Sequence, residues 1–137
     1  MKIVSIDASA AAAWLFHTQR TEAADRFLAC GDGHRYVAPT VFAWEIGNQI
    51  AVRARGSGVE AERLLRHLAS FDIEIAPAPG AETVFGSIEQ AIRRNLTLFD
   101  TAYLNHALTF GGALASRDGR LLDAARVAGV DVFDLRD

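Results

Sequence analysis

The chain has 137 residues, of which 50% are apolar and 23% are charged, and its net charge is −3. This length fits one compact domain and excludes a two-domain protein, and this composition excludes a disordered tail. The acidic balance argues weakly against a general nucleic-acid coat protein. We therefore expect a single globular domain over residues 1–137.

The number of cysteines and the length of the apolar runs indicate in which cellular compartment the protein is expected. The single cysteine, Cys30, can form no disulfide within the chain, which is typical of a reducing cytoplasm. The longest wholly apolar run near the N-terminus, Ala10–Phe16, is far shorter than the roughly 20 residues that span a bilayer. Asp7, in the middle of the first 16 residues, argues against reading this N-terminal segment as a signal peptide. We expect a cytoplasmic protein without a membrane segment.

Strands and helices are predicted to alternate along the chain, with glycine and proline marking most of the boundaries. In chain order the predicted elements are a strand at Ile3–Ile6, helices at Ser9–Phe16 and Thr21–Cys30, a strand at Tyr36–Ala38, helices at Thr40–Arg55 and Val59–Phe71, a strand at Ile73–Ala76, helices at Ala81–Arg94 and Leu98–Phe110, a strand at Ala113–Ala115, a helix at Gly119–Ala128 and a strand at Val130–Leu135. Such alternation favours a parallel sheet with helices on both faces. The fold class is therefore α/β, a three-layer α/β/α domain with about five strands, whose order we assume to be 3-2-1-4-5.

Acidic residues follow two strands that are neighbours in this assumed order. Asp7 comes directly after the first strand, and Asp118 follows the fourth, so both are expected to face the crevice where the strand order reverses. Helix capping is the alternative interpretation: Asp7 or Ser9 would cap the first helix and Asp118 the last. The segment Thr97–Asp100 likewise has the form of a capping box.

Capping does not account for Glu45, which lies about five residues inside its predicted helix. It is either a partly exposed glutamate, one paired with an arginine such as Arg53 or Arg94, or a ligand. Carboxylate oxygens without histidine or cysteine suit Mg²⁺ or Mn²⁺, and the chemistry that follows is hydrolysis of phosphodiesters. The candidate ligands are Asp7, Glu45, Asp100 and Asp118.

Four motifs in order along the chain carry a family resemblance. They are Ile6–Ser9, Pro39-Thr40 followed by Glu45, Leu98–Tyr103 and Ala115–Asp118. In this order and spacing, from residue 3 to about 134, the chain resembles the PIN-domain ribonucleases and, more narrowly, the VapC-type toxins of toxin–antitoxin pairs. Position 116 is serine where threonine is commoner in the family, which keeps the hydroxyl.

The resemblance implies a PIN-like domain with Mg²⁺- or Mn²⁺-dependent endoribonuclease activity. It implies that Asp7, Glu45, Asp100 and Asp118 hold the metal, with the Ser116 hydroxyl beside them. It further implies a homodimer and a cognate antitoxin whose tail covers the site. The alternative is a catalytically inactive PIN-like domain that binds RNA or protein, its acids serving only as helix caps.

Two further sets of residues are predicted to meet RNA or a partner. Arg117 and Arg120 flank the acids and are the best candidates for RNA phosphates. The early helices hold more large apolar side chains than their inward faces need, which predicts an exposed patch for a partner, with Trp14 and Trp44 as its main contacts. These side chains are Trp14, Leu15, Phe16, Phe27, Phe42 and Trp44.

Overall fold

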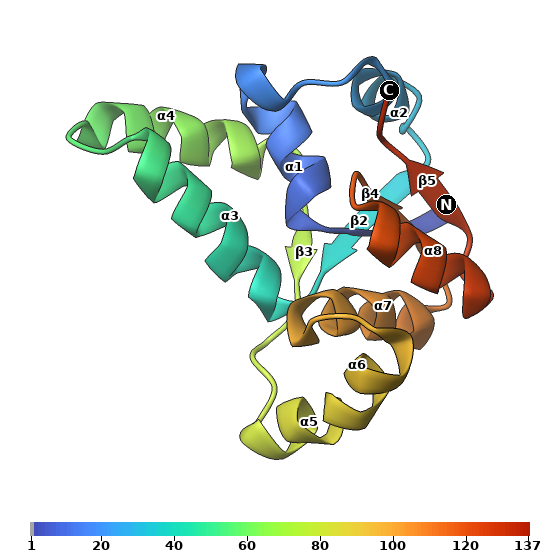
Figure 1. Cartoon of the computed structure of the whole chain (residues 1–137). Coiled ribbons are helices and arrows are strands. Elements are labelled where there is room, and N and C mark those ends of the chain that lie inside the picture. Colours follow the sequence, from blue (N-terminus) through green and yellow to red (C-terminus); the bar gives the residue numbers. More distant parts are fainter. Residues whose placement is uncertain (1) are drawn as a thin grey trace.

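A five-stranded parallel sheet forms the centre of the computed structural model, which describes residues 2–137 (Figure 1). The strands are β1 (Lys2–Ile6), β2 (His34–Ala38), β3 (Glu74–Ile75), β4 (Ala113–Ser116) and β5 (Val132–Asp134). Their order is β3-β2-β1-β4-β5, which confirms the assumed order 3-2-1-4-5. Because all the strands are parallel, their carboxyl ends lie along one edge.

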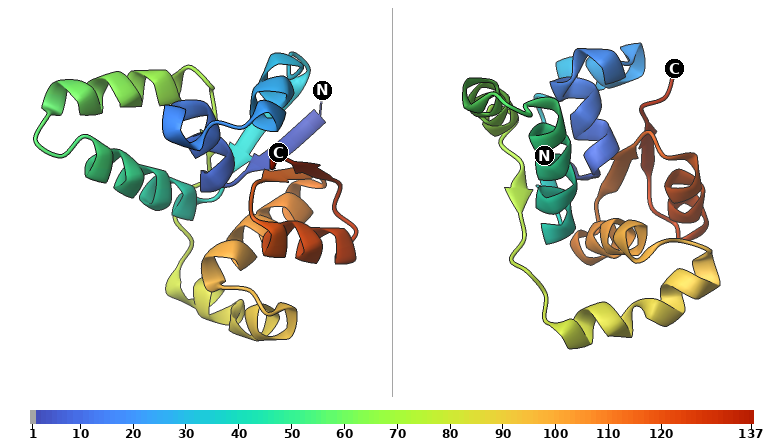
Figure 2. Two further views of the ribbon diagram at one scale, coloured as in Figure 1. Left: turned by 45° about the horizontal axis from the view of Figure 1, so that its top comes forward. Right: turned by 60° about the vertical axis from the view of Figure 1, so that its left-hand side comes forward.

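Helices cover both faces of the sheet, as the alternation of elements predicted (Figure 2). They are α1 (Ala8–Leu15), the short 3₁₀ helix η1 (His17–Gln19), α2 (Glu22–Ala29), α3 (Thr40–Arg53), α4 (Gly58–Ala69), α5 (Ala81–Gly86), α6 (Ile88–Arg94), α7 (Leu98–Phe110) and α8 (Gly119–Val127). The helices α1 to α4 form one layer, α7 and α8 form the other, and α5 and α6 lie beyond α7 (Figures 1 and 2). No helix within residues 2–137 is long and apolar enough to cross a membrane.

The alanine-rich helix α1 is buried on nearly all its sides, and this overturns part of the predicted surface patch. Trp14 is only 8% exposed; its indole N–H donates to the Ala24 carbonyl at 3.0 Å, and its ring packs against Phe27 and Phe71. Of the six large side chains that predicted the patch, only Trp44 is exposed, at 78%. The prediction that Trp14 binds a partner is wrong, because α2, α3 and α4 all pack around α1.

One predicted helix is two helices in the structure. The segment Ala81–Arg94 is interrupted at Ser87, so that α5 ends at Gly86 and α6 starts at Ile88. The Ser87 hydroxyl donates to the Thr83 carbonyl at 3.1 Å, a local bond that competes with continued helix. Glycine at the preceding position lowers the helix propensity further.

Gly112, between α7 and β4, is required by a close approach of two backbones. A Cβ at this position would overlap the carbonyl oxygen of Ile3 in β1. We expect Gly112→Ala to lower the free energy of unfolding by about 1–3 kcal/mol, since backbone must shift to admit the methyl group. Urea unfolding measures this. Gly33→Ala, where a Cβ meets no atom within 4 Å, is the control, and an equal loss in both variants would contradict the explanation.

Candidate functional site

The first two site residues are brought together by the pairing of β1 with β4. Ile6 is in register with Ala115, and the backbone N–H of Asp7 donates to the Ala115 carbonyl at 3.3 Å. Asp7 and Ser116 therefore lie side by side at the carboxyl edge of the sheet. Ligands of open α/β sheets bind at this edge, so the two residues lie where a ligand site was predicted.

Asp7 is buried, with 4% of its surface exposed, and both its oxygens accept hydrogen bonds. Its Oδ1 accepts from the Ser9 hydroxyl at 2.7 Å and from the Ala10 N–H at 2.9 Å, so the predicted cap of α1 is confirmed. Its Oδ2 accepts from the Ser116 hydroxyl at 2.5 Å, a contact that capping does not need. Burial nevertheless raises the pKa of Asp7 from 3.8 to about 6, because these bonds offset only part of the lost hydration.

Asp118 is joined to Asp7 through Ser116. The Ser116 hydroxyl that donates to Asp7 also accepts the Asp118 N–H at 2.9 Å. The Asp118 carboxylate caps α8 by accepting from the backbone N–H groups of Arg120 and Leu121, as predicted. Its charge contributes to raising the pKa of Asp7, so the two carboxylates lie near enough to repel each other.

Asp100 stands in the first turn of α7, where Thr97 provides the predicted cap by accepting the Asp100 N–H at 3.0 Å. The carboxylate is half-buried, and its pKa is raised by that burial first, then by the charge of Asp118, with a smaller contribution from Glu45. Arg120 acts in the opposite direction. Two other site acids therefore act on Asp100 through space.

Glu45 reaches the same region from α3. Its side chain is half-buried, and its Oε1 accepts a hydrogen bond from the Tyr103 hydroxyl at 2.7 Å. The predicted alternative of an arginine pair is wrong: Arg53 donates to Thr18 instead, and no ion pair within residues 2–137 joins Arg94 to Glu45. Glu45 is thus partly exposed and is held by a tyrosine of α7.

The four acids are linked in pairs and do not form a closed cage: the charge of Asp118 acts on both Asp7 and Asp100, and that of Glu45 acts on Asp100. Among residues 2–137, no three His, Cys, Asp or Glu side chains are close enough together to hold one metal ion. Their oxygens and their mutual repulsion nonetheless suit a hard divalent cation, which would neutralise the charges that raise the pKa values of Asp7 and Asp100. Mg²⁺ is commonly held by one or two carboxylates and several waters, so an open arrangement fits it.

The two arginines predicted to meet RNA differ in their surroundings. The Arg117 guanidinium is turned inward, where it donates to the Ser9 carbonyl at 2.7 Å and to the Gln19 side chain at 2.6 Å. Arg120 is exposed and its charge acts on Asp100. Arg120 is therefore the freer of the two to contact a phosphate.

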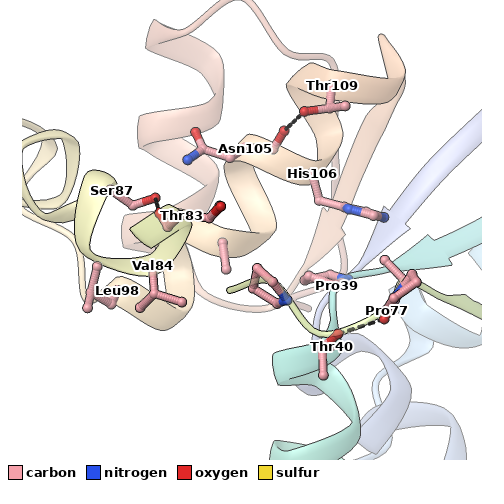
Figure 3. Close-up of a pocket in the computed structure, with 13 residues that line it drawn as sticks. Pro39, Thr40, Pro77, Thr83, Val84, Ser87, Leu98, Asn105, His106 and Thr109 are labelled. Atoms are coloured by element: carbon pink, nitrogen blue, oxygen red, sulfur yellow. Dashed lines mark hydrogen bonds between the residues drawn. The ribbon is translucent and has the colours of Figure 1, made fainter. Parts of the chain in front are cut away.

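A separate pocket of about 240 Å³ lies on another face of α7 (Figure 3). It is lined by Asn105 and His106 of α7, by Pro39 and Thr40 at the start of α3, and by parts of α5. Among the described residues 2–137, no Asp or Glu side chain lines it. The pocket is thus distinct from the carboxylate site.

Two contacts of the site were not predicted. The Tyr103 bond to Glu45 joins residues 58 positions apart, and the Ser9 hydroxyl, besides donating to Asp7, accepts the Arg117 N–H at 2.9 Å. The available signal for Tyr103 was its place one helical turn after Asp100, on a neighbouring part of the same helix surface.

Comparisons with known proteins agree with this architecture. Residues 4–127 match the PIN domain family. Ribonuclease VapC3 of Pyrobaculum aerophilum is 29% identical over 126 residues, which cover 90% of this chain and 94% of that protein. The crystal structure of PAE2754 from Pyrobaculum aerophilum shares the fold with a TM-score of 0.64 and 24% identity, over 96% of this chain and 90% of that one. A domain of a functionally unknown protein from Methanocaldococcus jannaschii gives a TM-score of 0.60 at 16% identity, over 100% and 93% of the two chains.

Proposed function

We propose, since this chain belongs to the PIN domain family, that it is a metal-dependent endoribonuclease and the toxin of a toxin–antitoxin pair. The observation that carries the proposal is the pair of carboxylates that Ser116 joins at the carboxyl edge of the sheet, Asp7 and Asp118, together with the action of the Asp118 and Glu45 charges on Asp100. Burial and the charges of the other acids raise the pKa values of Asp7 and Asp100 there. Such repulsion is costly for the folded protein and is expected where a cation binds.

The residues that we propose to hold the cation, directly or through bound water, are Asp7, Glu45, Asp100 and Asp118, with Mg²⁺ or Mn²⁺ as the cation. When bound, such an ion activates water and stabilises charge on phosphodiester oxygens. Ser116 holds Asp7 and the backbone of Asp118 in place through its two hydrogen bonds, at 2.5 and 2.9 Å. Asp100, in the first turn of α7, is held by the Thr97 cap at the side of this pair.

Arg120 is proposed to bind the RNA backbone next to the acids. Its exposed guanidinium can donate two hydrogen bonds to one phosphate, and its position near Asp100 would place that phosphate close to the carboxylates. Arg117 has a supporting part in this proposal, because its guanidinium fixes Ser9, which in turn donates to Asp7.

A metal-free PIN-like binding module remains the second candidate, and the caps favour it: Asp7 and Asp118 both accept the backbone N–H groups that a cap requires. Glu45 caps no helix and thus favours the enzyme. The deciding experiment is controlled expression in a bacterial host followed by mapping of RNA ends, with purified protein assayed with Mg²⁺ and with a chelator. New RNA ends that depend on Asp100 support the nuclease, and unchanged RNA supports the binding module.

The proposed partners are RNA, a cognate antitoxin and a second copy of the chain, in the cytoplasm, where the single Cys30 would stay reduced. The antitoxin would place a basic side chain among the carboxylates and an apolar segment on the α3 surface around Trp44. This exposed ring stands directly before Glu45 in the sequence, on the outer side of α3.

Trp44→Ala is expected to weaken binding of the co-encoded small protein about 30-fold, the effect typical of a tryptophan at the centre of an interface, and to leave RNA cleavage within a few-fold of wild type. Titration of that protein against each variant measures the first effect, and an RNase assay measures the second. Val127→Ala is the control, because Val127 is 90% exposed on α8 in the other helix layer. Equal affinities for wild type and Trp44→Ala would move the partner surface elsewhere.

A further inference from the structure

The Tyr103 hydroxyl is a polar group placed inside the core. Tyr103 is 1% exposed, and its hydroxyl donates to Glu45 Oε1 at 2.7 Å. Within the part of the chain that the structure describes, residues 2–137, no other hydrogen bond joins α3 to α7. A phenylalanine would fill the same space without a polar atom that needs a partner, so the hydroxyl has a use beyond packing.

This hydroxyl lies where three segments that carry site acids meet. Tyr103 is on α7 one turn after Asp100, and its bond reaches Glu45 on α3. It also lies near the start of α1, where the Ala8 backbone and the charge of Asp7 act on it. One side chain therefore contacts or borders the segments of Asp7, Glu45 and Asp100.

Glu45 requires such a partner to stay in the site. Its flexible side chain loses conformational freedom when it is held in one place, and its charge is repelled by that of Asp100. Without an attractive contact, the carboxylate would turn towards water. The Tyr103 phenol supplies that contact, because its hydroxyl donates to Glu45 Oε1 at 2.7 Å and its ring is held in the core.

We propose that Tyr103 is a positioning residue of the carboxylate site, whose hydroxyl holds Glu45 on the side of Asp100 and so completes the site for a divalent cation. This inference rests on the proposed function for the identity of the bound ion. Tyr103 acts through Glu45 and touches neither the ion nor the RNA. Loss of a hydrogen bond that orients a ligand typically weakens metal binding 10–100-fold.

The test compares Mn²⁺ dissociation constants, measured by electron paramagnetic resonance, for wild type, Tyr103→Phe, Glu45→Ala and the double variant. We expect Tyr103→Phe to bind Mn²⁺ at least about tenfold more weakly than wild type. In the Glu45→Ala background the same change should have no further effect, because the group that Tyr103 positions is gone. Tyr36→Phe is the matched control: it removes the other tyrosine hydroxyl of the chain, which lies in the aromatic cluster of Trp14 and Phe27, and should leave Mn²⁺ binding unchanged.

Urea unfolding of the same four metal-free proteins separates failure of this inference from failure of the proposed function. Non-additive shifts of the unfolding midpoint would show that Tyr103 and Glu45 are coupled, whether or not the protein binds a metal. Wild type that binds no Mn²⁺ would contradict the proposed function, and the unfolding cycle would then decide the Tyr103–Glu45 link alone. Additive shifts, or equal loss of Mn²⁺ affinity on Tyr103→Phe in both backgrounds, would overturn the inference.

Discussion

Asp100→Asn is expected to reduce RNA cleavage at saturating Mg²⁺ by about a hundredfold or more. The change keeps the shape of the side chain and the Thr97 cap, whose bond uses the backbone N–H, but it removes one negative charge from the proposed ligand set. Charge stabilisation by a bound cation is worth several kcal/mol in such reactions, and each 1.36 kcal/mol is about tenfold in rate. Single-turnover cleavage of a labelled RNA measures the effect.

Asp131→Asn is the matched control for this loss. It makes the same chemical change at an exposed residue before β5, at the opposite edge of the sheet from the carboxylates. Its cleavage rate should equal that of wild type, and its far-ultraviolet circular dichroism and that of Asp100→Asn should both match the native spectrum. Wild-type cleavage by a folded Asp100→Asn protein would remove Asp100 from the mechanism.

Asp7→Asn is expected to abolish cleavage and at the same time to stabilise the metal-free protein. Burial raises the pKa of Asp7 from 3.8 to about 6, so that the ionised group costs the native state roughly 3 kcal/mol at neutral pH. Asparagine is uncharged and can still accept the Ala10 N–H. At pH 8 the variant should therefore unfold at a temperature higher by the order of 10 °C.

The pH dependence of this difference has a definite sign. Between about pH 4 and pH 6 the native protein binds a proton at Asp7 more tightly than the unfolded chain does, so wild type loses stability as the pH rises through this window. Asp7→Asn lacks this loss. The difference in unfolding free energy should be smallest near pH 4 and constant above about pH 7; a difference that does not change with pH would contradict the assignment.

Mg²⁺ should reduce the stability advantage of Asp7→Asn over wild type. A ligand at a hundred times its dissociation constant stabilises the native state by about 2.7 kcal/mol, and wild type should gain this while Asp7→Asn gains much less. Thermal unfolding of both proteins with and without Mg²⁺ measures the gain. Equal gains in the two proteins would mean that the ion binds away from Asp7.

The sequence by itself determined most of the elements, apart from the break between α5 and α6 and the short η1, and the residue types of the candidate site. Local signals were sufficient for the strand before Asp7, for the Thr97 cap of α7 and for the alternation of strands and helices, since caps and periodicity depend on residues only a few positions apart. The acids that follow the first and fourth strands were recognisable for the same reason. The strand order that makes these two strands neighbours was an assumption, and the structure confirmed it.

Only the tertiary structure decided which helix faces are buried and which side chains from distant parts of the sequence contact each other. Trp14 is buried because helices from later in the chain surround α1, a fact that no local pattern of α1 contains. Arg117 turns inward because Gln19 and Ser9 accept its N–H groups across about a hundred residues of sequence. The contact between Glu45 and Tyr103 also depends on long-range packing, because it requires that α3 and α7 pack next to each other with these two side chains in reach.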